Sequence, residues 1–285
     1  MIPEILMKTK LLDRKVILVA GGAGGIGRET CKLFACRGAT LVIADNDAKG
    51  LEPFLEEIKT QSPKSIAFQG DLSLWKTWEE LVEISLNQFQ RIDALIHCVG
   101  VLIPGSFEGL KESDILCEVG ANFLSVVYGM KAVLPVMKRQ RRGQVINIGS
   151  LGGIVPMPFG SLYSATKFGV RGLSLSLNEE LRGTGVWVSL IEPSGVRTKM
   201  LDIEALDGQT MITFANSPLE ALEVAKAILS TLESPRREVI LPRFVGKLES
   251  ALGQHPNLFS MFYPLIHLLG GVGLNRYRKK FLSKV

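Results

Sequence analysis

One stretch near the N-terminus decides the fold class: VILVAGGAGGIG, residues 16–27, an apolar run that ends in a glycine-rich turn. The part before the glycines has the composition of a short buried strand, and the part after them continues as a helix. Glycines at such a junction let the backbone turn tightly and approach a pyrophosphate, whose charge meets the free N–H groups of the helix N-terminus. A flexible loop is the plainer alternative. The residues predicted to contact a dinucleotide here are Gly21, Gly25, Ile26 and Gly27.

A carboxylate follows the next predicted strand, residues 40–44. Asp45 lies 18 residues after Gly27, close to the offset of roughly 20 residues at which an acid holds the adenosine ribose hydroxyls. Because a carboxylate there repels the extra phosphate of NADP, and no arginine follows it directly, we predict NAD rather than NADP. Asp71 and Leu72 are expected to flank the adenine. As alternatives, Asp45 is a turn residue and Asp71 a helix cap.

Short apolar runs alternate with longer helical stretches along the chain. The predicted strands, apolar on both faces as buried parallel strands require, are residues 16–20, 40–44, 65–68, 92–96, 144–148, 186–191 and 238–241. The predicted helices are residues 27–37, 48–60, 73–90, 112–141, 161–182 and 218–233. In the last helix, Ser217 is expected to be the N-cap and Pro218 the first residue. This alternation predicts an α/β fold, a Rossmann-type doubly wound parallel sheet of about seven strands with helices on both faces.

Four polar side chains are spaced for acid–base chemistry on an oxygen. Tyr163 and Lys167 are four residues apart on a predicted helix, so both project from one face. A phenol titrates near pH ~10, and a nearby ammonium lowers that pKa, which lets Tyr163 act as base in alcohol oxidation and as acid in ketone reduction. Ser150, at the end of the fifth strand, is expected to hydrogen-bond the substrate oxygen. Asn122 is expected to hold a water that links Lys167 to solvent, or else to be an ordinary hydrogen-bonding helix residue.

The ordered set of these residues resembles the classical short-chain dehydrogenases/reductases over about residues 11–241. The family's glycine motif matches Gly21, Gly25 and Gly27. Its catalytic residues match Asn122, Ser150, Tyr163 and Lys167. Its nicotinamide-contacting segment matches residues 193–198. The resemblance implies hydride transfer between a nicotinamide cofactor and a CH–OH or carbonyl group, in a protein that forms a homo-oligomer, a dimer or a tetramer. The further residues that it implies as cofactor contacts are Gly100, Tyr163, Lys167, Pro193, Val196 and Thr198.

The chain departs from the family pattern at two places. Ala20 stands where the family usually has threonine, so one hydroxyl hydrogen bond to the glycine turn is lost. The family's Asn-Asn-Ala-Gly is His97-Cys98-Val99-Gly100 here, and Cys98 cannot replace the amide that ties neighbouring strands together. We expect these changes to affect local rigidity and cofactor affinity more than chemistry, and we expect His97 to be a packed or surface residue.

Composition limits the remaining possibilities. The chain of 285 residues, of which 46% are hydrophobic, is long enough for one large domain. We assign residues 1–241 to it, with a substrate loop over about 194–216, and residues 242–285 to a helical extension. The four cysteines have no paired spacing and the three histidines are not clustered, so we expect reduced thiols, a cytoplasmic location and no metal site. No secretory signal is expected.

Apolar residues dominate near the predicted site. They are Leu102, Ile103, Leu151, Ile154, Val155, Met157, Phe159, Met200, Leu201, Met211, Ile212 and Phe214. Only Arg197 and Lys199 are placed to meet a substrate carboxylate or phosphate. Such a pocket suits a lipophilic secondary alcohol or ketone of the steroid, retinoid or fatty type, whereas ordinary core packing is the plainer explanation.

The basic character of the chain belongs to its C-terminal end. Residues 236–285 carry nine Lys or Arg and two acids, whereas the whole chain has a net charge of +5. Residues 258–274 are strongly apolar but short and interrupted for a membrane span, so a segment in the membrane interface with its basic end on anionic headgroups fits better. An arm that covers the substrate cleft or a partner subunit explains the pattern equally well. The tail lacks a readout pattern for nucleic acid, and we expect no nucleic-acid binding.

These observations favour an NAD-dependent oxidoreductase of a lipophilic secondary alcohol or ketone, in which Tyr163 is the general acid/base. The alternative is a catalytically silent nucleotide-binding or membrane-docking protein on the same fold. The intact Ser150, Tyr163 and Lys167 argue against that alternative, and the altered segment 97–99 argues for it.

Overall fold

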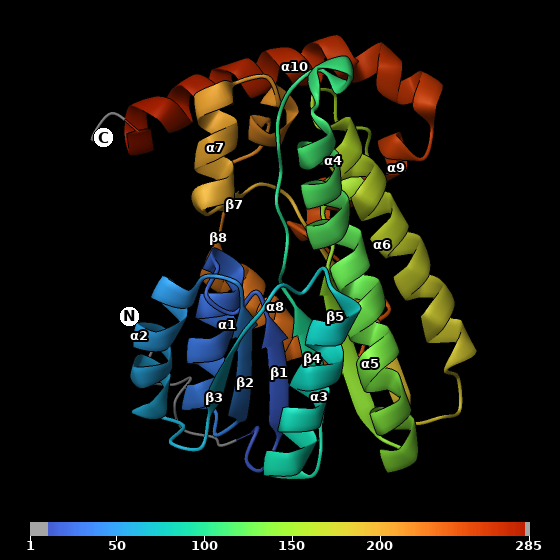
Figure 1. Cartoon of the computed structure of the whole chain (residues 1–285). Coiled ribbons are helices and arrows are strands. Elements are labelled where there is room, and N and C mark those ends of the chain that lie inside the picture. Colours follow the sequence, from blue (N-terminus) through green and yellow to red (C-terminus); the bar gives the residue numbers. More distant parts are fainter. Residues whose placement is uncertain (1–10, 283–285) are drawn as a thin grey trace.

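Seven apolar strands pair in parallel into one sheet with helices on both faces (Figure 1), which confirms the predicted Rossmann-type fold. The computed structural model describes residues 11–282, except for the side chain of Val245. The strands of the sheet, in spatial order, are β3 (Ile66–Gln69), β2 (Thr40–Asp45), β1 (Val16–Ala20), β4 (Ala94–His97), β5 (Gly143–Ile148), β6 (Val186–Pro193) and β9 (Glu238–Leu241).

The order of the strands reverses between β1 and β4. From β1 the chain runs outward to β2 and β3, and then returns to place β4 on the other side of β1. Ala20, the last residue of β1, is in parallel register with Ala44 of β2 and His97 of β4. Ligands of open α/β sheets bind outside the carboxyl ends of the strands at such a reversal. The topology therefore places the expected site beside Gly21, which directly follows Ala20.

Two layers of helices cover the sheet. The buried side chains of α1, α2 and α8 pack on one face, and those of α3, α5 and α6 pack on the other. The helices are α1 (Gly25–Cys36), α2 (Ala48–Lys59), α3 (Trp75–Phe89), α4 (Glu112–Val119), α5 (Ser125–Gln140), α6 (Ser161–Glu180), α7 (Lys199–Asp207), α8 (Ala221–Glu233), α9 (Arg243–Gly253) and α10 (Pro256–Tyr277). The shorter helical turns are η2 (Phe107–Gly109), η3 (Gly120–Leu124), η4 (Leu151–Gly153), η5 (Met211–Phe214) and η6 (Arg278–Leu282).

The start of α8 differs from the prediction. The helix begins at Ala221 rather than at Pro218, so the predicted cap at Ser217 is wrong. Residues Leu219–Glu220 form a short strand, β8, which pairs in parallel with β7 (Val196–Arg197). The last residue of β8 is the N-cap of α8. A pairing with a distant part of the chain thus overrides a local capping signal, as tertiary contacts commonly do.

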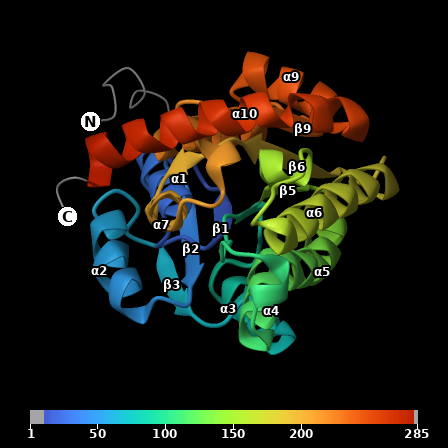
Figure 2. The same ribbon diagram turned by 90° about the horizontal axis from the view of Figure 1, so that it is seen from above.

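The C-terminal extension is helical and lies across the carboxyl ends of the strands. Helix α10 crosses the top of the molecule and α9 lies at one end of it (Figures 1 and 2). Beneath α10 are α7 and η5, which belong to the predicted substrate loop. The extension is therefore part of the same packed body as the sheet.

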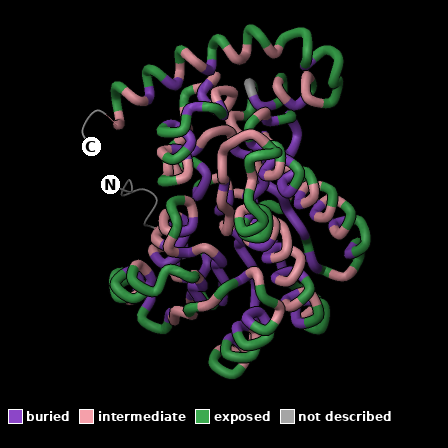
Figure 3. Tube along the Cα trace, turned by 45° about the horizontal axis from the view of Figure 1, so that its top comes forward, coloured by how far each residue is buried: buried purple, intermediate pink, exposed green. Residues whose placement is uncertain are grey.

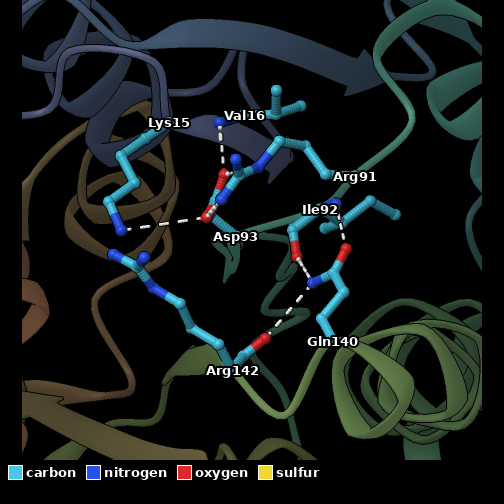
Figure 4. A network of polar contacts seen from close by, with 7 residues as sticks. All are labelled: Lys15, Val16, Arg91, Ile92, Asp93, Gln140 and Arg142. Carbon is cyan, nitrogen blue, oxygen red and sulfur yellow. Dashed lines mark hydrogen bonds and ion pairs between the residues drawn. The ribbon is translucent and has the colours of Figure 1, made fainter.

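A buried carboxylate joins the opposite, amino-terminal edge of the sheet. Asp93, just before β4, accepts a hydrogen bond from the Val16 N–H of β1 at 2.9 Å (Figure 4). The Arg91 guanidinium binds both oxygens of this carboxylate at 2.6 and 2.9 Å, and Lys15 Nζ lies 3.8 Å from it. Gln140 of α5 clamps the main chain of Ile92 beside this group. These contacts fix the start of β1 relative to β4.

We predict that Asp93→Ala lowers the free energy of unfolding by about 3 kcal/mol, because it leaves the Val16 N–H and a partly buried guanidinium without their acceptor. Asp93→Asn keeps one acceptor and should lose less. Urea denaturation followed by circular dichroism measures both changes. The control Glu179→Ala removes a solvent-exposed partner of two arginines, and its effect on stability should be much smaller because exposed ion pairs contribute little. Equal losses for Asp93→Ala and Glu179→Ala would contradict this role of Asp93.

Candidate active site

The glycine turn between β1 and α1 is built so that only glycine fits at two of its positions. Gly21 has a φ of +75°, and a Cβ there would lie 2.8 Å from the backbone nitrogen of Val99. A Cβ on Gly27 would collide with the carbonyl oxygen of Gly21. The absence of these side chains brings the backbone of α1 close to the turn. This cradle has the shape and the exposed N–H groups that a pyrophosphate requires.

Backbone and carboxylate contacts hold the turn in place of the hydroxyl that Ala20 lacks. The N–H groups of Gly21 and Gly22 both donate to the carbonyl oxygen of Ala44, at 2.8 and 3.2 Å. The Ala23 N–H donates to Asp45 Oδ2 at 2.9 Å. Asp45 therefore also supports the turn, in addition to facing the cavity described next.

One cavity of about 730 Å³ runs from the glycine turn to the underside of α10. Its lining includes nearly all the residues predicted to contact the cofactor, namely Gly21, Gly25, Ile26, Asp45, Asp71, Leu72, Gly100, Tyr163, Lys167, Pro193, Val196 and Thr198. Gly27 lies behind this wall, where it shapes the turn. The side chain of Thr198 lies against Gly25, because a Cβ on Gly25 would collide with Thr198 Cγ2. The tertiary structure thus brings together predicted cofactor contacts from six separate parts of the chain.

Ser150, Tyr163 and Lys167 all line this cavity. Ser150 follows β5, and the other two residues lie one turn apart near the start of α6. Ser150 and Tyr163 approach each other beside Gly152, because a Cβ on Gly152 would lie 3.4 Å from both Ser150 Oγ and Tyr163 Cε1. Lys167 Nζ lies 5.6 Å from the centre of the Tyr163 ring and donates a hydrogen bond to the Ile148 carbonyl at 3.0 Å. The arrangement places a hydroxyl, a phenol and an amine around one point.

The pKa values in the site differ from the sequence-based expectation. Burial raises the pKa of the Tyr163 phenol, and hydrogen bonding from Ser150 counteracts only part of this increase. In the protein alone, burial thus outweighs the lowering of the Tyr163 pKa that the sequence predicted from Lys167. Burial instead lowers the pKa of Lys167 to about 8. The protein alone therefore favours the neutral phenol, and a further positive charge in the cavity would favour the phenolate.

Asn122 lies in the π-helical turn η3, which interrupts the helix predicted over residues 112–141. Its side chain is buried, and both of its polar groups bind the backbone of Val101 at 2.8 Å. A Cβ on Gly100 would lie 3.4 Å from Asn122 Oδ1 and 3.5 Å from Lys167 Nζ. Asn122 is thus adjacent to Lys167 and fixes the loop after β4. Turns of this kind recur at functional sites.

Comparison with known proteins identifies the family. Residues 15–207 match the model of the short chain dehydrogenase family. The chain belongs to the short-chain dehydrogenases. It is 30% identical over 191 residues to a 3-oxoacyl-acyl-carrier-protein reductase of Thermotoga maritima, covering 67% of this chain and 78% of that protein. It is also 29% identical over 238 residues to a 3-ketodihydrosphingosine reductase of Bacteroides thetaiotaomicron, covering 82% of each. A short-chain dehydrogenase/reductase from Burkholderia phymatum, solved in complex with NAD, is structurally similar, with a TM-score of 0.80 at 24% identity over 87% of this chain and 95% of that one.

Family membership makes the chain an NAD(P)-dependent oxidoreductase of CH–OH groups and the corresponding carbonyls. The geometry above accommodates the cofactor of this family, because the glycine cradle and the acid after β2 line the same cavity. The departures from the family pattern do not remove any of these features. In this short-chain dehydrogenase, one cavity therefore joins the glycine cradle to Ser150, Tyr163 and Lys167.

Glu192, at the end of β6, is a buried carboxylate behind the site that sequence reasoning missed. Glu192 Oε2 accepts a hydrogen bond from the Ser150 N–H, and Glu192 Oε1 lies 3.9 Å from Arg171 Nε. Burial raises its pKa to about 8, and its charge favours the ammonium form of Lys167. An acid in the apolar context of residues 186–191 is the signal that could have revealed it. Glu192 links the position of Ser150 to the charge of Lys167.

The altered segment after β4 is packed rather than catalytic. His97 is buried and stacks on Trp78, with ring centres 5.9 Å apart, on the side of the sheet covered by α3. Neither ring nitrogen has a hydrogen-bond partner within residues 11–282. Burial lowers the pKa of His97 to about 3, so the ring is neutral at physiological pH. The expectation of a packed histidine is confirmed. Cys98 does line the cavity, and burial raises the pKa of its thiol to about 12.

The end of the cavity farthest from the glycine turn is mostly apolar. Several side chains that were predicted to surround the substrate do line the cavity, namely Leu102, Leu151, Val155, Met157, Met200, Leu201 and Ile212. Those that do not are Ile103, Ile154, Phe159, Met211 and Phe214, which pack elsewhere or face solvent. Lys199 lines the cavity, whereas Arg197 is paired with Glu220 outside it. Phe259 and Ile266 of α10 also line the cavity, as the alternative of an arm over the substrate cleft predicts for residues 258–274. Leu252 of α9, which was not predicted, lines it as well.

We predict that Lys167 of the cofactor-free protein titrates near pH 8, because burial disfavours its ammonium form. The neutral, reactive amine then predominates above pH 8 instead of above its ordinary pKa. Competitive acetylation across pH 6–11 with mass spectrometry measures this midpoint. Glu192→Gln should lower the midpoint further, since it removes a charge that stabilises the ammonium. The control Glu249→Gln changes a carboxylate of the same cavity that does not act on Lys167. A Lys167 midpoint near 10.5, or equal shifts in the two variants, would contradict this coupling.

Proposed function

We propose that this short-chain dehydrogenase is an NAD-dependent oxidoreductase of a lipophilic secondary alcohol or ketone. The observation that carries the proposal is a single cavity in which Ser150, Tyr163 and Lys167 lie between a dinucleotide cradle and an apolar pocket. When bound, the nicotinamide accepts or supplies the hydride. The remaining chemistry is proton transfer and charge stabilisation at the substrate oxygen, and side chains of the cavity supply both.

In the oxidation direction, Tyr163 takes the hydroxyl proton of the alcohol while the carbon loses hydride. Ser150 donates a hydrogen bond to the same oxygen and stabilises its developing charge. Glu192 holds Ser150 in place through its backbone N–H. In the cavity, the cationic nicotinamide and the Lys167 ammonium both favour the phenolate, which offsets the effect of burial on the Tyr163 pKa. In the reduction direction, Tyr163 returns the proton.

The apolar lining supports a lipophilic substrate. The pocket beyond Tyr163 combines aliphatic and aromatic side chains with few polar groups, which suits a mainly hydrocarbon ligand. Glu204 is one of the polar exceptions, and its carboxylate is buried against the hydroxyls of Thr210 and Thr213. The names of two relatives denote reductases of 3-oxoacyl-acyl-carrier-protein and of 3-ketodihydrosphingosine. A substrate of this kind, with an oxo or hydroxyl group on a hydrocarbon chain, agrees with the pocket.

Asp45 supports NAD as the preferred cofactor, although a cation lies close to the same part of the cavity. Arg28 of α1 lines the cavity together with Asp45, and its guanidinium carbon lies 4.0 Å from the ring centre of Phe54. The prediction of NAD rested on the absence of an arginine directly after Asp45, whereas Arg28 lies in the helix that follows the glycine turn. The negative charge of Asp45 offsets the positive charge of Arg28 in this part of the cavity. A neutral ribose hydroxyl is therefore preferred there to a negatively charged phosphate. The balance makes cofactor choice sensitive to a single charge.

We further propose that the protein is a cytoplasmic homo-oligomer, a dimer or a tetramer as is common in its family. We also propose that the protein contacts a membrane peripherally, through its C-terminal extension, residues 242–285.

We predict that Tyr163→Phe lowers kcat with secondary alcohols by about 100-fold or more, the usual contribution of a general acid/base. NADH affinity, measured by cofactor fluorescence, should stay within about twofold, since the cradle is unchanged. The assay follows NADH absorbance with a panel of secondary alcohols of increasing chain length, for which kcat/KM should rise with length. A wild-type protein that binds NADH but turns over none of the panel would instead support the catalytically silent alternative.

We predict that Asp45→Asn strengthens NADPH binding by about tenfold relative to NADH, because it removes the repulsion of the phosphate but keeps an acceptor for the Ala23 N–H. Cofactor fluorescence titrations of both dinucleotides measure the ratio. Adding Arg28→Gln to this variant should abolish the gain. An unchanged NADPH/NADH ratio in Asp45→Asn would exclude Asp45 as the residue that selects the cofactor.

A further inference from the structure

Helix α10 is apolar on two opposite faces, and only one of them is covered by the protein. The inner face contains Phe259, Gly270, Leu274 and Tyr277, all buried. Leu274 and Tyr277 pack against the substrate loop, whereas Phe259 packs against the segment after β5. At Gly270 the helix lies so close to η5 that a Cβ would collide with the Met211 carbonyl. No charged residue occurs from residue 256 to residue 275, so the outer face cannot be a solvated polar one. A helix that is apolar all round is normally covered on every side.

The outer face of α10 is formed by exposed positions that recur along the whole helix between intermediate and buried ones (Figure 3). Its large apolar side chains recur every three or four residues, and they are Leu258, Met261, Phe262, Leu265, Leu268, Leu269 and Val272. Each is between 39% and 65% exposed. On α9, Phe244 and Leu248 extend the exposed apolar surface, with Phe244 being 85% exposed. We call these nine residues the lid surface.

Basic side chains border the lid surface at both ends. Arg276, Lys279 and Lys280 continue the same three- and four-residue spacing beyond Val272, and all three are exposed. On α9, exposed Arg243 and Lys247 flank Phe244. The one acid between residues 243 and 282, Glu249, turns inward, where it binds Asn216 and lines the cavity. An apolar stripe framed by cations and without exposed acids is complementary to an anionic bilayer.

The contacts of the inner face indicate that α10 lies along a bilayer rather than across it. By length and composition alone, residues 256–282 could cross a membrane. However, Tyr277 donates a hydrogen bond to Asp202 at 2.7 Å, and Arg278 donates to the Ala205 carbonyl at 2.6 Å. Phe259 and Ile266 line the cavity itself. A spanning orientation would break these contacts, whereas an orientation parallel to the membrane keeps them.

We propose that the lid surface docks this protein on an anionic lipid bilayer, with α9 and α10 lying in the interface. One helix, α10, then separates the bilayer from the substrate cavity. A lipophilic substrate dissolved in the membrane has to pass only the edge of this helix to reach Tyr163. This delivery route rests on the proposed function, whereas docking itself does not.

The test is co-sedimentation of the full chain with vesicles of phosphatidylcholine alone or mixed with phosphatidylglycerol. We expect binding to the mixed vesicles, and Leu265→Glu should weaken it at least tenfold, because it places a charge where a leucine is buried in lipid. Arg276→Gln with Lys280→Gln should weaken binding to mixed vesicles by about 30-fold and have little effect on neutral ones. The matched control is Ile84→Glu, an exposed apolar residue of α3 at the opposite end of the molecule. This control should bind within twofold of wild type.

Three outcomes would overturn docking: no binding to mixed vesicles, equal binding by Leu265→Glu and wild type, or sedimentation of the wild type as a dimer that Leu265→Glu dissociates. The last outcome would assign the lid surface to a second copy of the chain. Turnover of a short, water-soluble secondary alcohol separates the two proposals, because Leu265→Glu should leave it unchanged. A long-chain secondary alcohol in mixed vesicles should be turned over at least tenfold more slowly by Leu265→Glu. Equal rates with that alcohol would overturn the delivery route alone.

Discussion

The parallel pairing of β1 with β2 on one side and β4 on the other is the constraint on which the rest of the structure depends. It brings the ends of three strands to one edge of the sheet and leaves a gap where the strand order reverses. The glycine turn fills that gap because residues without a Cβ can pass close to Val99 and to each other. Asp93 holds the same strands together at the other edge, far from the chemistry (Figure 4). The amino-terminal edge thus supplies stability, and the carboxyl edge supplies the site.

Burial determines the chemistry of the site. Ser150, Tyr163 and Lys167 lie deep enough that the protein alone disfavours both the phenolate and the ammonium. Glu192 partly compensates for Lys167, but it is itself buried and has a raised pKa. Three coupled groups held away from their ordinary pKa values respond strongly to any charge that enters the cavity. A cationic cofactor would therefore change the protonation of the whole group rather than that of Tyr163 alone.

Helix α10 explains why a covering arm and a membrane segment fitted the C-terminal sequence equally well. Its inner face closes the substrate cavity, and its outer face is apolar and bordered by cations. The two explanations describe two sides of one helix. A covering helix with this second apolar side would bring the substrate pocket within one helix diameter of a hydrophobic phase.

The sequence by itself determined the strand–helix alternation, the glycine turn and the grouping of Tyr163 with Lys167, because each depends on neighbours within a few residues. It placed Gly21 and Asp45 in one site through the known geometry of a single strand–helix–strand unit. Only the tertiary structure decided the start of α8, the approach of Arg28 to the cofactor end of the cavity and the contact of Glu192 with Ser150. It also decided the direction of the Tyr163 pKa shift and the two-sided packing of α10. These features depend on desolvation and on contacts between distant segments, and such quantities have no local signature in the chain.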